Sequence, residues 1–150
     1  MPCQPAFPRP RVGRVNPCVA PYRPGVSRSS ADSAGLSALV ASISTGESPD
    51  AGQLRDAVRA LLGVLRERAP GRTVEVRVPP FGAIQCIAGP RHTRGTPPNV
   101  VETDPVTFVL LAAGRLGWVE AVADGRVSAS GTRADLSPFL PLVELHSGRE

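Results

Sequence analysis

The sequence predicts an α+β domain in which one sheet of about four to five strands packs on one layer of helices. Apolar residues recur first at helical spacing, then alternate with polar residues, and the two patterns interchange toward the C-terminus. A chain of 150 residues suits one domain. Its hydrophobic content of 41% can support a core, which aliphatic side chains must fill because aromatic residues make up only 4%.

Two helices are expected before the first strand. In the first helix the apolar residues recur at helical spacing, and Gly46 can end it. The second helix has Ser48 or Asp50 as its N-cap and stops near Pro70 and Gly71. The stripe of the first helix is Leu36, Leu39, Val40 and Ile43, and that of the second is Leu54, Val58, Leu61, Leu62 and Leu65.

The spacing of apolar residues then changes to every second residue. Valines alternate with charged residues over Val74–Val78, and Pro79–Pro80 ends the pairing there. A second strand is expected at Ala83–Ala88, antiparallel to the first because the link is short. Val100–Thr103 and Arg126–Ser130 are predicted to be the third and fourth strands.

Further helices are predicted around the fourth strand. Asp104 caps a helix over Pro105–Gly114, and Trp118–Ala123 forms a second, short one. A capping box at Thr132–Asp135 predicts a last short helix that runs through Leu136 and Phe139.

The N-terminal segment, residues 1–30, is dense in Pro, Arg and Ser. We expect it to be disordered, because it has too few large apolar residues to offset the entropy of ordering, and we assign the domain to residues 31–150. Met1 is the only methionine, so one hypothesis places the natural start further in, at a codon such as that of Val26. Mass spectrometry of the native N-terminus would refute it by detecting peptides that cover Cys3–Arg23.

The net charge of +4 by itself suggests a nucleic-acid partner. Every basic residue is Arg, however, and many lie in the N-terminal segment. An Arg-only, Ala/Gly/Pro-rich composition is also typical of a GC-rich genome. The predicted domain does not interleave aromatic with basic residues, so we expect no nucleic-acid binding.

Cysteines and apolar runs indicate the compartment. The chain has three Cys and no CxxC pair, which excludes a thioredoxin-type pair and the usual zinc sites and favours a reduced setting. Prolines interrupt the N-terminus where a secretory signal needs an apolar run. The longest apolar run, Val106–Ala113, is too short to cross a bilayer. We therefore expect a soluble, cytoplasmic protein without stable membrane insertion.

The segment "VVETDPVTFVLLAAGRLGWVEAVADGRVSASGTRADLSPFL" resembles the C-terminal half of the sterol carrier protein-2 fold. The shared pattern is an edge strand ending in Asp104, a helix closing on "AAGRL", a short helix before a small-Gly turn, a strand ending in Ser-Gly and a final amphipathic helix. "RTVEVRVPPFGAIQC" and "GPRHTRGTPPN" are similar to the bacterial, mainly actinobacterial, branch of that family. The resemblance covers residues 48–143.

The resemblance implies a sheet of about five strands, helices on one side and an apolar tunnel between the layers. Family members bind sterols, fatty acids or acyl-CoA, and some are fused to mycothiol-dependent isomerases. The chain has only His92 and His146, so a His-rich metal site of that isomerase type cannot be assembled. We therefore expect no metal, no cofactor and no enzymatic activity.

The helix after Asp104 is apolar almost all round, since Thr107 is its only polar residue within Val106–Ala113. The surplus apolar surface can face ordinary core, a dimer partner or a ligand cavity. Trp118 either borders a cavity mouth or seals the core. Cys86, among apolar neighbours, is interpreted as a small hydrophobe and not a nucleophile. The candidate lining of an apolar pocket is Phe81, Ile84, Cys86, Phe108, Leu111, Trp118, Val122 and Phe139.

The loop "PRHTRGTPPN" is the most polar part of the predicted domain. Arg91, His92 and Arg94 are candidates for binding an anion such as a fatty-acid carboxylate, a phosphate or a CoA tail. The alternative is a solvated connector. His92 has no strong nucleophile beside it, and no G-x-S-x-G, Walker or H-E-x-x-H motif occurs, so we name no catalytic residue.

The leading hypothesis is non-catalytic binding or carriage of a lipid or other hydrophobic molecule of the sterol, fatty acid or acyl-CoA class. Two alternatives stay open. One is a scaffold that fills the tunnel with its own side chains and binds a protein partner or a second copy of itself. The other is an accessory domain of a thiol- or CoA-linked enzyme.

Overall fold

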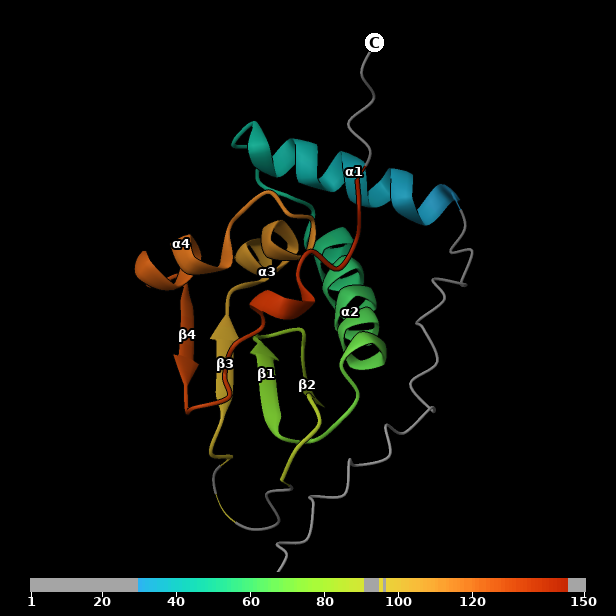
Figure 1. The fold of residues 1–150 in the computed structure, drawn as a ribbon. Coiled ribbons are helices and arrows are strands. Elements are labelled where there is room, and N and C mark those ends of the chain that lie inside the picture. Colours follow the sequence, from blue (N-terminus) through green and yellow to red (C-terminus); the bar gives the residue numbers. More distant parts are fainter. Residues whose placement is uncertain (1–29, 91–94, 96, 146–150) are drawn as a thin grey trace, which may run out of the picture.

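The structure, a computed structural model, describes residues 30–90, 95 and 97–145 (Figure 1). Within these residues, a four-stranded sheet carries helices on one face, which confirms the predicted α+β class. The helices are α1 (Ser30–Ser44), α2 (Ala51–Arg68), α3 (Pro105–Ala112), α4 (Trp118–Ala123) and the 3₁₀ turn η1 (Ser137–Phe139). The strands are β1 (Val74–Val78), β2 (Gly82–Cys86), β3 (Val100–Thr103) and β4 (Val127–Ser130). The expectation of disorder concerns residues 1–30, of which residues 1–29 lie outside this description and Ser30 begins α1.

The strand order is β2-β1-β3-β4, and the sheet is mixed. β1 pairs antiparallel with β2, as its short link predicts, and parallel with β3, which in turn pairs antiparallel with β4. The expectation that the strand before Asp104 lies at an edge is wrong. β1 and β4 cover the two sides of β3, so that β2 and β4 are the edges among the described strands.

The two faces of the sheet differ in polarity because side chains alternate along each strand. On the helix face the register places four apolar residues side by side: Ile84, Val76, Val101 and Ala129. The opposite face carries charges. Arg77 Nε lies 2.6 Å from Glu75 Oε1, and Arg77 Nη1 lies 4.0 Å from Glu102 Oε2. The apolar interior therefore lies on the helix side.

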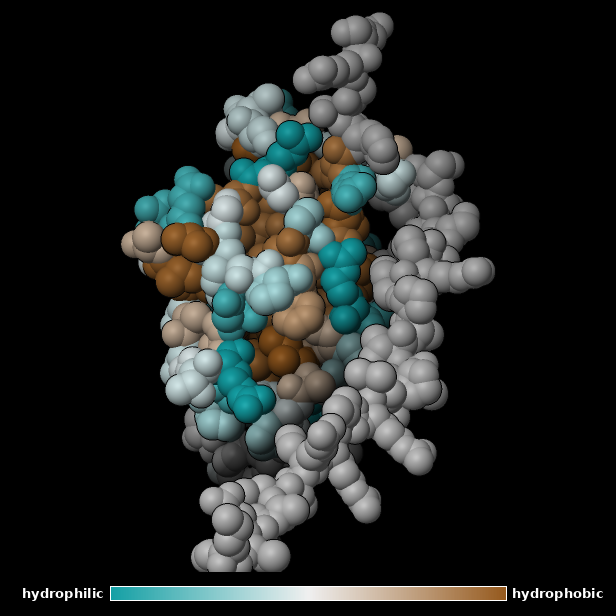
Figure 2. Space-filling model, in the orientation of Figure 1, coloured by the Kyte–Doolittle hydropathy of each residue, from teal (hydrophilic) through white to brown (hydrophobic). Residues whose placement is uncertain are grey.

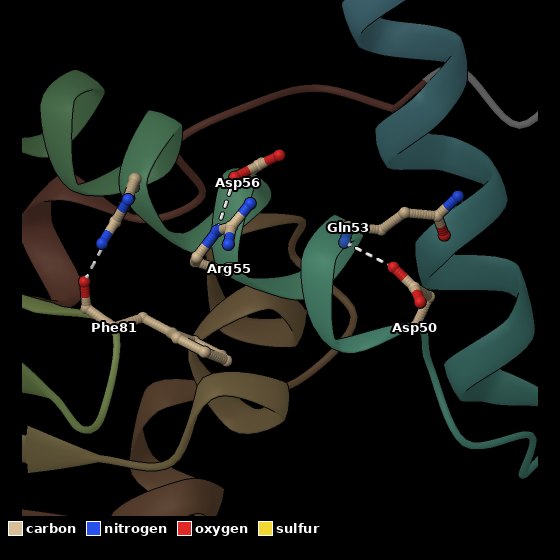
Figure 3. A network of polar contacts seen from close by, with 6 residues as sticks. Asp50, Gln53, Arg55, Asp56 and Phe81 are labelled. Carbon is tan, nitrogen blue, oxygen red and sulfur yellow. Dashed lines mark hydrogen bonds and ion pairs between the residues drawn. The ribbon is translucent and has the colours of Figure 1, made fainter.

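Helix α2 begins at a side-chain cap. Asp50 Oδ1 accepts a hydrogen bond of 2.9 Å from the Gln53 N–H (Figure 3), which decides between the two expected caps. Its predicted apolar stripe is buried: Leu54, Val58, Leu61, Leu62 and Leu65. On the exposed side, Arg59 Nε donates to the Phe81 carbonyl oxygen at 3.3 Å and ties the helix to the turn between β1 and β2.

Helix α3 lies at the centre of the helical layer. Asp104 Oδ1 caps it by accepting from the Thr107 N–H at 2.9 Å. At its other end the Ala112 carbonyl oxygen accepts from the N–H groups of Leu142 and Val143, at 2.8 and 3.1 Å. α2 packs along α3, and α1 crosses the end of both (Figure 1). The apolar surface of α3 beyond what the sheet needs is thus covered by other segments of the chain.

The last predicted helix is wrong in type and in its cap. Residues Ser137–Phe139 form only a 3₁₀ turn, whose N-cap is Leu136 and has no side-chain capping hydrogen bond; Asp135 Oδ1 accepts from the Ser137 N–H at 2.8 Å outside such a cap. Pro138 and Pro141 explain the difference, because neither has an N–H to continue a helical ladder. The chain continues extended instead and crosses the ends of α2 and α3.

Candidate functional site

Aliphatic side chains and Phe108 lie between the helix face of the sheet and helices α2 and α3, and we call them the apolar layer. Three candidate lining residues are buried in it: Cys86, Phe108 and Leu111. Four others are half-buried and pack against it: Phe81, Ile84, Trp118 and Phe139. The structure therefore brings these seven side chains to one continuous core.

Val122 does not join this group. It is 38% exposed, whereas its neighbour Ala121 is the buried residue of α4. Val119, on the same exposed side of the helix, is 78% exposed. Apolar surface is visible at this edge of the molecule in Figure 2. Helix α4 therefore carries a small apolar surface toward solvent, which the sequence pattern did not indicate.

Trp118 lies at the margin of the apolar layer. It is the first residue of α4 and follows Gly117, the N-cap of that helix. Its side chain is half-buried and packs against the core cluster. This position is compatible with both expected roles, sealing the core and bordering an opening.

Cys86 is fully buried at the end of β2. Burial raises the pKa of its thiol to about 11, because the thiolate would lose its hydration inside the protein. The thiol is therefore protonated at neutral pH, and a protonated buried thiol is a poor nucleophile and a poor metal ligand.

The buried polar residues of the described chain are all uncharged: Thr73, Asn99, Thr103 and Thr107. Each is held by hydrogen bonds; for example, Thr103 Oγ1 donates to the Arg126 carbonyl oxygen at 2.9 Å, and Thr107 Oγ1 accepts from Arg126 Nε at 3.2 Å. Within the described residues no His, Cys, Asp and Glu side chains gather in a group that suits a metal ion. The interior thus suits an uncharged apolar guest better than a charged one.

The other candidates lie elsewhere. Arg91, His92 and Arg94 fall outside the described residues. Sequence reasoning missed an open groove of about 400 Å³ at the edge strand β2. Arg72 and Gln85, thirteen positions apart, meet there, and only the pairing of β1 with β2 makes them neighbours. The lining residues are Arg66, Pro70, Gly71, Arg72, Ala83, Ile84 and Gln85.

Comparison with known protein families identifies the family of this chain. The family described as bacterial SCP ortholog matches residues 50–142, from the cap of α2 to the segment that crosses α3. The chain belongs to this family. The match confirms the resemblance to bacterial sterol carrier proteins and spans every strand of the sheet. A search of curated proteins gave no match.

The matched region holds the sheet and helices α2 and α3, which enclose the apolar layer, whereas α1 lies outside it. Among the described helices, none has the length and apolar character needed to cross a membrane.

Proposed function

We propose that the protein binds a lipid or other hydrophobic molecule of the sterol, fatty acid or acyl-CoA class and carries it without chemical change. Family membership supports a general role as a lipid-binding carrier. The observation that carries the proposal is the composition of the interior: its buried side chains are apolar, and its few buried polar residues are uncharged and already hydrogen-bonded. Burying a hydrocarbon chain contributes about 0.8 kcal/mol per methylene before costs.

In this proposal the guest lies in an apolar tunnel between the sheet and α3. Cys86, Phe108 and Leu111 form its inner lining, and the half-buried Phe81, Ile84, Trp118 and Phe139 lie at its margins. Aromatic side chains that are already partly in solvent lose the least packing when a guest displaces them. Val122 contributes only if α4 shifts, because it is exposed.

The absence of chemistry is part of the proposal. A catalytic cysteine would need a lowered thiol pKa, whereas burial raises that of Cys86. The polar loop is proposed to select an acidic head group through Arg91, His92 and Arg94. Substitution of Arg91 and Arg94 by Ala is then expected to weaken the binding of a fatty acid more than the binding of the matching fatty alcohol.

The first experiment is native mass spectrometry of the full chain after purification without detergent or organic solvent. A co-purified hydrophobic molecule is the expected result. Binding is then measured with a dansyl-labelled undecanoic acid, whose dansyl group accepts energy from Trp118, the only tryptophan in the chain. Saturable quenching of Trp118 fluorescence is expected.

A matched pair of variants locates the bound probe. Leu111→Phe adds bulk inside the apolar layer, where Leu111 is 3% exposed, and is expected to weaken binding of the dansyl probe about tenfold. Val119→Phe adds bulk on the exposed side of α4 and is expected to leave binding unchanged. A protein that purifies without a guest and leaves Trp118 unquenched would contradict the proposal.

A second candidate function is a scaffold that fills its own interior and binds a protein partner. Two observations favour it: α3 is enclosed by segments of its own chain, and Val119 is 78% exposed. Light scattering and native mass spectrometry separate the two functions. A guest-free mass together with a stable dimer or hetero-complex, broken by Val119→Asp, is the result expected of a scaffold.

A further inference from the structure

The open groove of about 400 Å³ lies where the end of α2 meets the edge strand β2. α2 contributes Arg66, and the link from α2 to β1 contributes Pro70, Gly71 and Arg72. The three central residues of β2 contribute the other side. β2 has β1 as its neighbour and, among the described strands, nothing on its other side. Within the described part of the chain, the groove is therefore open to solvent and to a ligand.

The lining of this groove is positively charged. Arg66 and Arg72 are both exposed, and no acidic residue lines the groove. Among the described residues, no carboxylate lies within ion-pair distance of either guanidinium group. This is unlike Arg55 on the same helix, which lies 2.9 Å from Asp56. Two arginines that form no ion pair with a described carboxylate, in one groove, favour a bound anion.

Gln85 positions one of these arginines. Its side-chain oxygen Oε1 accepts a hydrogen bond of 3.0 Å from Arg72 Nε. This contact uses Nε, and no other residue in the described part of the chain binds the terminal nitrogens of Arg72, which therefore keep their donors for a ligand. A planar guanidinium held at Nε presents those donors in a fixed orientation, as bidentate binding of a carboxylate or phosphate requires.

The wall that carries Arg72 is anchored on both sides. The Ile87 N–H donates to the Ala69 carbonyl oxygen at 2.7 Å, and the Thr73 N–H donates to the Cys86 carbonyl oxygen at 3.1 Å. Gly71 approaches so closely that a Cβ atom there would lie 2.0 Å from the Ile87 carbonyl oxygen. The backbone of the groove is thus formed before a ligand arrives, which lowers the entropy lost on binding.

The rest of the lining is apolar. Pro70, Ala83 and the half-buried Ile84 offer a short apolar strip beside the arginines. An inorganic anion would leave this strip uncovered, whereas a short alkyl group attached to the anion would cover it.

We propose that this groove binds a small organic anion, with its carboxylate or phosphate held by Arg66 and Arg72 and its apolar part on Pro70 and Ile84. The site lies at the margin of the apolar layer, with which it shares Ile84, and does not depend on carriage of a lipid in the interior. Gln85 acts as a positioning residue for Arg72.

The test is a titration of the ¹⁵N-labelled full chain followed by NMR, with hexyl phosphate, hexanoate, hexanol and inorganic phosphate as probes. Saturable shifts are expected at the backbone amides of residues 71–72 and 83–85 for hexyl phosphate, hexanoate or both, and the tighter of the two identifies the anion. Hexanol and inorganic phosphate are each expected to bind at least about tenfold more weakly.

Three arginine variants with the same change in net charge, together with Gln85→Ala, decide the location of the bound probe. Arg66→Ala and Arg72→Ala are each expected to weaken the tighter probe about tenfold, the loss of one charge-assisted contact. Gln85→Ala is expected to weaken it less, and Arg55→Ala, at the other end of α2, not at all. Each arginine variant is expected to fold, because these arginines are exposed, and dispersed amide spectra check this.

Three results would overturn the proposal. Equal weakening by Arg55→Ala would show unspecific attraction to a basic protein, and hexanol binding as tightly as hexyl phosphate would show an apolar site only. Loss of hexyl phosphate binding in Leu111→Phe would place the probe in the interior. The dansyl probe of the apolar layer is expected to bind normally to Arg72→Ala, so the two proposals fail separately.

Discussion

Arg68 and Leu142 join the last turn of α2 to the C-terminal end of the described chain. Arg68 Nη2 donates to the Leu142 carbonyl oxygen at 3.0 Å. Nη1 of the same guanidinium donates to the carbonyl oxygens of Phe139, at 3.0 Å, and of Pro141. The Leu142 N–H in turn donates to Ala112 of α3. One side chain thus fixes the segment that closes the core beside α3.

Arg68→Ala is expected to destabilise the protein by about 2 kcal/mol, because three carbonyl oxygens lose a charged donor. The measurement is urea unfolding followed by circular dichroism. Arg66→Ala, two positions earlier, is the matched control and is expected to change the free energy of unfolding by less than about 0.5 kcal/mol, since Arg66 is exposed. Equal effects of the two substitutions would show that the contacts of Arg68 contribute nothing specific.

Asn99→Ala is expected to lower the free energy of unfolding by about 2–3 kcal/mol, because it removes the hydrogen-bond partner of two backbone groups. Asn99 is buried where β1, β3 and the segment after β4 meet. Its Nδ2 donates to the Thr73 carbonyl oxygen at 3.1 Å, and its Oδ1 accepts from the Arg133 N–H at 3.0 Å. Asn99→Asp keeps the acceptor but buries a charge beside a carbonyl oxygen, so an even lower unfolding midpoint at neutral pH is expected. A midpoint for Asn99→Asp above that of Asn99→Ala would contradict this account.

Gly71 and Gly63 are expected to respond in opposite directions to alanine. Gly71→Ala places Cβ 2.0 Å from the Ile87 carbonyl oxygen at a φ of 152°, so a loss of at least about 3 kcal/mol is expected. Gly63→Ala, within α2, meets nothing within 4 Å and is expected to stabilise by up to about 1 kcal/mol through helix propensity. Thermal unfolding of both variants checks the signs, and a stable Gly71→Ala protein would refute the close approach.

The elements that depend on local signals were predictable. The third strand, Val100–Thr103, and the short helix Trp118–Ala123 have the predicted bounds, and Asp104 caps the helix that Pro105 opens. Each is set by neighbours a few positions away. The prediction of the last helix was wrong because it used the capping pattern at Thr132–Asp135 alone. The prolines that prevent a helix come after that pattern.

Features that depend on strand order were not predictable. A strand of four residues has the same sequence pattern at an edge or in the interior of a sheet. Only the pairing of β3 with both β1 and β4 shows that β3 is an interior strand. The candidate lining shows the same limit. Inward alternation and helical spacing place Cys86 and Phe108 in the core, whereas the outward position of Val122 depends on α4 packing through Ala121. The two groove arginines, Arg66 on α2 and Arg72 in the link to β1, were not singled out because exposed arginines are common on protein surfaces.

The last prediction concerns alkaline pH and Cys86. Burial raises the pKa of this thiol from 9.0 to about 11 in the folded protein. The unfolded chain therefore releases the proton first as the pH rises, so the stabilising effect of the neutral thiol is complete below pH 9 and is lost between pH 9 and 11. In that window the free energy of unfolding is expected to fall by up to about 1.4 kcal/mol per pH unit through this group. Cys86→Ala costs some packing at neutral pH but removes this slope. Guanidinium unfolding of both proteins between pH 7 and 11 is the measurement: the two free energies should converge above pH 9, and parallel curves would show that the thiol titrates in the folded protein as it does in the unfolded chain.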